Sequence, residues 1–178
     1  MKYKITILAI TIMTTATMAQ NACLNDDVGQ GKASTFKTTF HRETSVSIDI
    51  KSDPEIIWAL LTKASDYPRW NSTVTSIEGN VALGEKIKLK STLDAKRTFK
   101  LKVKEFVPEN KLVWGDGQGK RVYSLRKNES GSVTFSMTER IGGLMFPMYA
   151  KMIPSFDKSF EQFADDLKKE SEKIMSTK

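Results

Sequence analysis

The stretch IDIKSDPEIIW (residues 48–58) contains the change of pattern that decides the fold. Its beginning completes an alternating run, 45–51, whose apolar residues share one face, and this alternation predicts a strand. Ser52 or Asp53 can then cap a helix, and Pro54 suits a first helical turn because its missing N–H is not needed there. The apolar residues that follow recur at helical spacing. We therefore predict a strand that leads directly into a short helix.

Downstream of this helix the pattern changes to short alternating runs. A second short helix or turn is predicted over 65–70, around Pro68. The strand-like runs that follow are separated by Gly-, Asn-, Pro- and Ser-containing turns, and they cover 73–78, 85–91, 98–107, 111–114, 121–126 and 132–141. Successive strands joined by such short turns form an antiparallel meander.

The chain closes with a long amphipathic helix. Phe156, Phe160 and Phe163 recur at helical spacing. Pro147 could lie in the first turn of this helix, or Pro154 could kink it or mark its start. An antiparallel sheet that is apolar on one face must cover that face, and this helix is the available cover. The fold class is therefore α+β.

This order of elements and three local stretches resemble a known superfamily. The stretches are 48–58, then YPRWN (67–71), then VKEFVP (103–108). They are similar to the START/birch-pollen-allergen-like helix-grip superfamily (SRPBCC), which includes polyketide cyclases, dehydrases and lipid-transport proteins. The resemblance covers residues 44–176. It implies a helix-grip fold, in which a curved antiparallel sheet wraps around a long C-terminal helix, with two short helices after the first strand and a cavity between sheet and helix.

The N-terminus has the features of an export signal. Two lysines precede an uncharged apolar run, and small residues precede a cleavage position after Ala19, so 1–19 is predicted to be a signal peptide. A transmembrane anchor or a buried helix are the alternatives. Residues 20–43 are polar and are predicted to be a flexible lead-in, and the folded domain is predicted over 44–176. The protein is accordingly expected in the periplasm or outside the cell.

Cysteine and histidine usage limits the chemistry. Cys23 is the single cysteine, so no internal disulfide can form; following a leader, it could carry a lipid anchor or be a free thiol. His41 is the single histidine and precedes the predicted domain, which leaves no catalytic triad inside it. Metal-ligand spacing is absent, so neither a metal nor a cofactor is predicted. The glycines of 115–119 fit a hairpin turn better than a phosphate-binding loop.

One polar constellation is predicted on the inner face of the sheet. The parity of the apolar residues directs Trp114, Arg121, Tyr123 and Glu139 inward. A turn centred between Gly117 and Gln118 sets Trp114 opposite Arg121. The next turn sets Arg121 opposite Met137 or Glu139. A buried arginine and carboxylate must pair, and the pair is either structural or a polar anchor for a ligand head group.

These features favour an exported carrier for a hydrophobic small molecule or lipid. An alternative is a polyketide cyclase/dehydrase-like enzyme in which Tyr123, Arg121 or Glu139 handles protons, and another is an interaction module with a filled core. Methionines suit a pocket for flexible apolar ligands. The predicted cavity lining comprises Trp70, Trp114, Arg121, Tyr123, Met137, Glu139, Met148, Met152 and Phe156.

Lysines also alternate along two neighbouring predicted strands. We call this set the lysine comb: Lys86, Lys88, Lys90, Lys100, Lys102 and Lys104. The comb is either a solvated outer face that protects against edge pairing or a contact for an anionic membrane. Nucleic acid is not a predicted partner, because this face lacks interleaved stacking aromatics.

Overall fold

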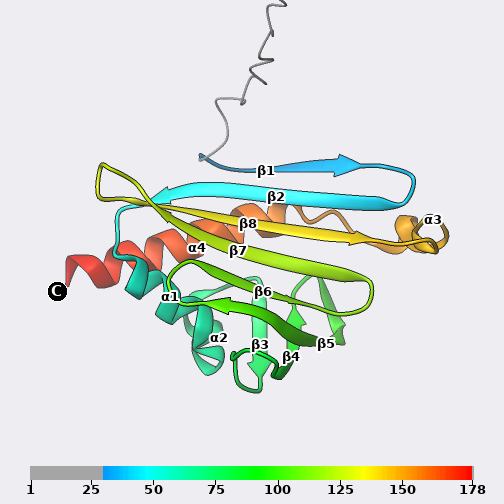
Figure 1. Cartoon of the computed structure of the whole chain (residues 1–178), viewed down its shortest axis with the longest axis horizontal. Helices are drawn as coiled ribbons and strands as arrows, with labels where there is room; N and C mark the ends of the chain where they lie inside the picture. The colour runs from blue at the N-terminus through cyan, green and yellow to red at the C-terminus, as the bar shows by residue number, and fades with distance from the viewer. Residues whose placement is uncertain (1–29, 178) are drawn as a thin grey trace, which may run out of the picture.

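The computed structural model describes residues 30–177 (Figure 1). These residues form an eight-stranded antiparallel sheet in the order β1-β2-β8-β7-β6-β5-β4-β3, so that the meander from β3 to β8 is joined to the first hairpin by the pairing of β2 with β8. The strands are β1 (Gln30–Lys37), β2 (His41–Ile50), β3 (Val74–Glu78), β4 (Lys86–Ser91), β5 (Asp94–Val107), β6 (Lys111–Gly115), β7 (Gly119–Lys127) and β8 (Val133–Gly142).

Helices cover one face of this sheet. The long helix α4 (Asp157–Ser176) lies across it, as Figure 1 shows, and buries Phe160, Phe163 and Leu167 against it. The shorter helices are α1 (Pro54–Thr62), η1 (Ala64–Asp66), α2 (Tyr67–Trp70), α3 (Phe146–Tyr149) and η2 (Ala150–Met152). The predicted α+β class, the antiparallel sheet and the covering C-terminal helix are confirmed.

The long helix begins at Asp157 rather than at either proline considered from the sequence. Pro147 lies in the separate helix α3. Ile153 is extended, with φ −85° and ψ 119°, because a residue that precedes proline is disfavoured in helical conformation. The connection from β8 to α4 therefore contains two short helical turns before the long helix starts.

The predicted flexible lead-in over 20–43 is too long. Residues 30–37 form β1, and β2 already begins at His41, four residues before the predicted strand. The half-buried positions of β1 carry small residues and not large apolar ones, so its alternation was not recognised; Ala33 and Thr35 are half-buried and their neighbours are exposed. The predicted leader 1–19, Cys23 and the first part of the lead-in lie outside the described residues.

The stretch that resembles the helix-grip superfamily has a structural role. The Tyr67 hydroxyl donates a hydrogen bond to the backbone oxygen of Leu61 at 2.8 Å. The Trp70 ring meets the Phe163 ring edge-on, with centroids 5.6 Å apart. The Asn71 Oδ1 accepts hydrogen bonds from the backbone N–H groups two and three residues further on, which turns the chain into β3. These residues fasten α1 and α2 to α4 and the sheet.

Candidate ligand-binding interior

Aromatic side chains fill the space between the sheet and α4. Phe163 is 1% exposed and contacts the rings of Tyr67, Trp70, Tyr123 and Phe135, with centroids 5.6 to 6.4 Å apart. Such distances are those of ordinary aromatic packing in a core. The predicted inner face is therefore apolar, and its aromatic rings pack against one another around Phe163.

Most of the predicted lining residues do face this interior. The buried ones are Trp70, Trp114, Tyr123, Met137 and Phe156. Strand parity predicted the inward direction of Trp114, Tyr123 and Met137.

Met148 and Met152 are the exceptions and correct the predicted lining. They are 75% and 82% exposed. Both belong to the α3–η2 connection, which extends past the end of the sheet in Figure 1, so their side chains have no inner face to cover.

The predicted polar row across three strands is present. Trp114 lies opposite Arg121, and Arg121 lies opposite Glu139, which settles the register left open by the sequence. Arg121 donates from Nε and Nη2 to the Glu139 carboxylate, and both side chains are 17% exposed. Gly115 permits this register, because a Cβ there would lie 2.2 Å from the backbone oxygen of Gly119.

Burial and the ion pair set the protonation states of this row. Burial raises the pKa of Tyr123 to about 12, against the opposing effect of the Arg121 charge. For Arg121, burial disfavours the charge, but Glu139 and Tyr123 outweigh burial and raise its pKa. Tyr123 is therefore neutral at physiological pH and can serve as a hydrogen-bond donor, but it is a poor base.

Arg42 belongs to the same interior and was missed from the sequence. It is 7% exposed and donates from Nη1 to the Ile153 oxygen at 3.2 Å and from Nη2 to the Pro154 oxygen at 2.8 Å. Its guanidinium lies 4.5 Å from the centroid of the Phe156 ring. Extending the inward parity of β2 back by two more steps, through Thr44, would have found it.

Two arginines enclose a pair of stacked rings at this end of the interior. Phe156 and Phe160 stack with an interplanar angle of 5° and centroids 5.9 Å apart. Arg42 covers the first ring, and the Arg121 guanidinium lies 5.2 Å from the centroid of the second. Cation–π contacts of this kind hold the start of α4 against the sheet.

Three buried side-chain polar atoms lack hydrogen-bond partners among the described residues. They are Trp70 Nε1, the Tyr123 hydroxyl and Asn71 Nδ2, and the first two belong to rings of the aromatic interior. The Tyr123 hydroxyl lies in the field of the Arg121 charge without a hydrogen bond of good geometry. Both rings contact Phe163. Because unpaired buried donors are costly, such atoms mark a place where a polar group of a ligand would be stabilised.

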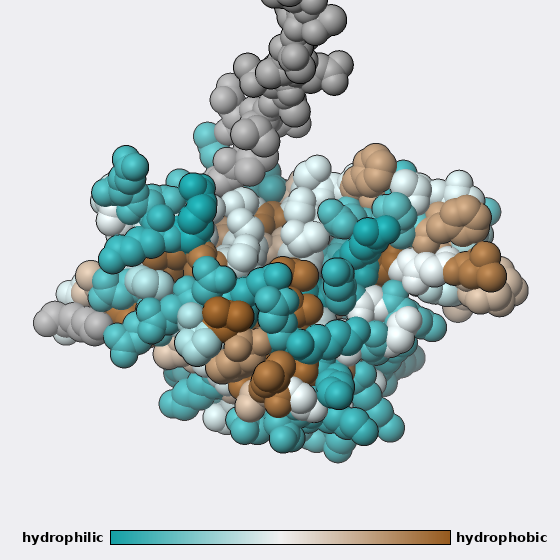
Figure 2. Space-filling view, viewed as in Figure 1, coloured by the Kyte–Doolittle hydropathy of each residue, from teal (hydrophilic) through white to brown (hydrophobic). Residues whose placement is uncertain are grey.

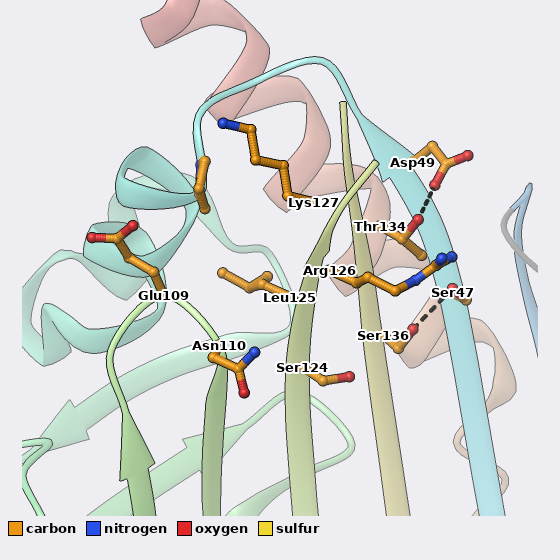
Figure 3. A pocket seen from close by; sticks show the side chains of 11 residues that line it. Ser47, Asp49, Glu109, Asn110, Ser124, Leu125, Arg126, Lys127, Thr134 and Ser136 are labelled. Carbon is orange, nitrogen blue, oxygen red and sulfur yellow. Dashed lines mark hydrogen bonds between the residues drawn. The ribbon is translucent and has the colours of Figure 1, made fainter. Parts of the chain in front are cut away.

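A separate polar hollow lies on the opposite, outer face of the sheet. Figure 3 shows its lining from β2, β7 and β8, and its volume is about 700 Å³. Thr134 donates to Asp49 at 2.6 Å, and Ser47 and Ser136 share a hydrogen bond of 2.9 Å. These polar groups satisfy one another, and the hollow is separated from the apolar interior by the sheet itself.

The lysine comb has the predicted geometry. Lys86 lies opposite Lys102, and Lys88 lies opposite Lys100, on the exposed face of β4 and β5.

Within residues 30–177, the acidic, histidine and cysteine side chains form no cluster of three or more that could hold a metal ion. None of the helices described there is both long and apolar enough to cross a membrane.

Comparison with known proteins agrees with this architecture. The model of a family described as polyketide cyclase/dehydrase and lipid transport matches residues 41–172. Comparison with proteins of curated function gave no significant match.

Solved structures share the fold at low sequence identity. A START superfamily protein from Mycobacterium smegmatis superposes with a TM-score of 0.55 at 13% identity, covering 74% of this chain and 98% of its own. A hypothetical protein from Helicobacter pylori gives 0.58 at 14%, covering 71% and 86%. A conserved protein of unknown function from Enterococcus faecalis gives 0.57 at 13%, covering 78% and 75%.

Proposed function

The chain belongs to the polyketide cyclase/dehydrase and lipid transport family, and from this premise we propose that it carries a hydrophobic small molecule or lipid between the sheet and α4. The family binds hydrophobic ligands in general. The inner face of this chain is suited to such a ligand, since aromatic side chains dominate it and a polar row lies at one end.

The observation that carries the proposal is the pair of unpartnered atoms, Trp70 Nε1 and the Tyr123 hydroxyl. The indole N–H is a donor only, and the phenol can donate as well. The ligand we propose is therefore an apolar molecule with at least one acceptor oxygen, such as a carboxyl, carbonyl or hydroxyl group. Its oxygen would accept from these donors while its hydrocarbon part replaces aromatic contacts around Phe163.

Uptake requires the interior to open. Phe160 and Phe163 occupy the space that a ligand would need, so α4 must move away from the sheet or these rings must change rotamer. Binding free energy would offset the lost packing, and the ligand would then stabilise the folded protein in proportion to its concentration.

Carriage is favoured over catalysis by the state of the polar row. Glu139 is already engaged by Arg121, and burial keeps Tyr123 protonated. A base with an orienting partner is the usual requirement of acid–base chemistry, and this row does not supply one. The cyclase-like alternative would use Tyr123 as a donor to a carbonyl, and it predicts that the bound compound is recovered chemically changed.

The test is titration with a fluorescent long-chain fatty acid, beside a hydrocarbon dye that has no oxygen. Tyr123→Phe should nearly keep the stability of the parent, because its hydroxyl makes no hydrogen bond of good geometry to Arg121. It should weaken fatty-acid binding by roughly fivefold and leave the hydrocarbon dye unaffected, as loss of one hydrogen bond implies. Tyr149→Phe, on α3 and outside the interior, is the matched control.

Two results would contradict the proposal. If neither probe binds the parent protein, the interior is a filled core and the chain is an interaction module. If Tyr123→Phe binds both probes as the parent does, the ligand does not use this hydroxyl. Mass spectrometry of the bound compound after incubation separates carriage, which returns it intact, from catalysis.

Export is a further part of the proposal and rests on the sequence pattern of 1–19. The mature protein would begin after Ala19 and reach the periplasm or the exterior. N-terminal sequencing of the protein from its own host tests this: an intact Met1 on cytoplasmic protein contradicts it. If Cys23 is found to carry a lipid, the exported protein is anchored to a membrane and is not free.

A further inference from the structure

Exposed apolar side chains gather at the end of the molecule where β8 leads toward α4. We call this group the apolar tip, and it consists of Phe40, Leu144, Met145, Met148 and Met152, with exposed fractions from 53% to 84%. Phe40 comes from the β1–β2 turn and joins the others because its backbone oxygen accepts a hydrogen bond of 2.9 Å from Gly143. In Figure 2, brown and tan atoms mark this end over α3.

The tip is held outward by the surrounding structure. Gly142 lies so close to the β1–β2 turn that a Cβ there would lie 2.5 Å from the Phe40 oxygen. At the other end of the segment, Arg42 holds the oxygens of Ile153 and Pro154. Phe146 is the anchor in between, since it is 4% exposed. The methionines are therefore exposed by an anchored segment, and an apolar group held in water in this way indicates an interaction surface.

Cationic side chains border the tip. A hollow of about 650 Å³ is lined by Phe40 and Leu144 together with Lys104, Lys120 and Arg140. These three cations are exposed on the outer face of β5, β7 and β8, and Lys104 is also a member of the lysine comb. The acidic residue of the hollow is Asp116, whose carboxylate accepts hydrogen bonds from two backbone N–H groups of its own turn. The rim therefore presents positive charge beside the apolar side chains.

We propose that the apolar tip docks on an anionic lipid bilayer, with its methionines and Leu144 among the acyl chains and the hollow against lipid phosphates. Apolar side chains bordered by lysine and arginine are the composition of interfacial membrane contacts. Methionine suits this role because its unbranched side chain adapts to a fluid partner. The three cations on the border of the tip are the observation that favours an anionic bilayer over an apolar protein partner.

The proposal is independent of interior binding, and it makes the tip, not the lysine comb, the main contact. The experiment is flotation of the protein with vesicles of phosphatidylglycerol and phosphatidylcholine, against vesicles of phosphatidylcholine alone. The parent should float with the anionic vesicles and lose binding as salt is raised. Combining Leu144→Ser, Met148→Ser and Met152→Ser should weaken binding by roughly tenfold or more.

Matched variants distinguish the contribution of the apolar tip to vesicle binding from that of other exposed surfaces. Leu83→Ser with Met175→Ser removes exposed apolar side chains elsewhere and should leave flotation unchanged. Lys120→Glu with Arg140→Glu should reduce binding more than Lys86→Glu with Lys100→Glu on the comb. Because all these residues are exposed, the variants should unfold at the parent's denaturant midpoint, which is checked first.

Three outcomes would overturn the proposal. The tip variant could float as well as the parent. The comb variant could lose binding while the tip variant keeps it, which would assign docking to the comb. Light scattering could show that the parent self-associates through the tip and ignores vesicles, which would make the partner a second copy. Fatty-acid titration of the tip variant without vesicles reports on the interior separately.

Discussion

The packed interior and the apolar tip use the same residue types in opposite ways. Met137 is 1% exposed in the interior and Met152 is 82% exposed in the tip. Two consecutive residues of β8 also differ in the face they occupy. Glu139 pairs with Arg121 on the inner face, whereas Arg140 lines the hollow beside the apolar tip on the outer face. An apolar side chain that is buried on folding stabilises the folded protein, whereas one that stays exposed can instead stabilise a complex when a partner covers it. Mutations at matched positions should therefore affect stability in one region and association in the other.

The largest difference is expected at the aromatic residues. Phe163→Ala removes the ring that contacts four others and should lower the free energy of unfolding by about 3–5 kcal/mol. Phe40→Ala, in the tip, should change it by less than about 0.5 kcal/mol. Urea denaturation of both variants measures this. Equal losses in the two variants would show that the tip is part of the core.

A smaller but still large difference is expected at the arginines. Arg121→Met leaves Glu139 without its partner and should cost about 3 kcal/mol, whereas Arg140→Met should be nearly neutral. The double variant Arg121→Met with Glu139→Leu should recover much of the loss, because no unpaired charge remains.

That double variant also tests what the pair is for. If it folds and binds the fluorescent fatty acid as the parent does, the pair is structural. If it folds and binds only the hydrocarbon dye, the pair positions the polar end of the ligand. Parent-like stability of each single variant would contradict the inward placement of both residues.

The smallest effect concerns pH at the boundary of the two regions. Asp157, the first residue of α4, accepts hydrogen bonds from Ser155 and Thr35, and these bonds lower its pKa in the folded protein. A carboxyl whose pKa is lowered by folding adds stability above its unfolded value of about 3.9, and this stability is lost as the pH falls through the folded pKa. Acidification below about pH 4 should therefore loosen the contact between β1 and α4.

The measurement is the urea midpoint as a function of pH. Asp157→Asn should lower the midpoint at neutral pH and make its decline in acid shallower than that of the parent. Thr35→Val removes one of the two donors and should produce a smaller change in the same direction. An unchanged pH profile in Asp157→Asn would show that other carboxyls govern the acid limb.

Local pattern was sufficient to predict the meander, the covering helix and the inward parity of Trp114, Arg121, Tyr123 and Glu139. Strand alternation and helical spacing depend on residues that are close in the sequence, so they can be recognised without knowledge of the fold. The outward face of the lysine comb could be predicted for the same reason. The alternation of β1 was too weak to read, since its half-buried positions carry glycine, alanine and threonine.

Tertiary structure alone decided the rest. The pairing of β2 with β8 brings Arg42 to the carbonyls of Ile153 and Pro154, more than a hundred residues away in the chain, and no local pattern encodes that contact. The space left between the sheet and α4 also depends on side chains from distant parts of the sequence, so only the packed structure shows that aromatic rings occupy it. Met148 and Met152 carry an apolar signature that suits a core or a docking surface, and the anchoring of their segment beyond the sheet is what makes them exposed.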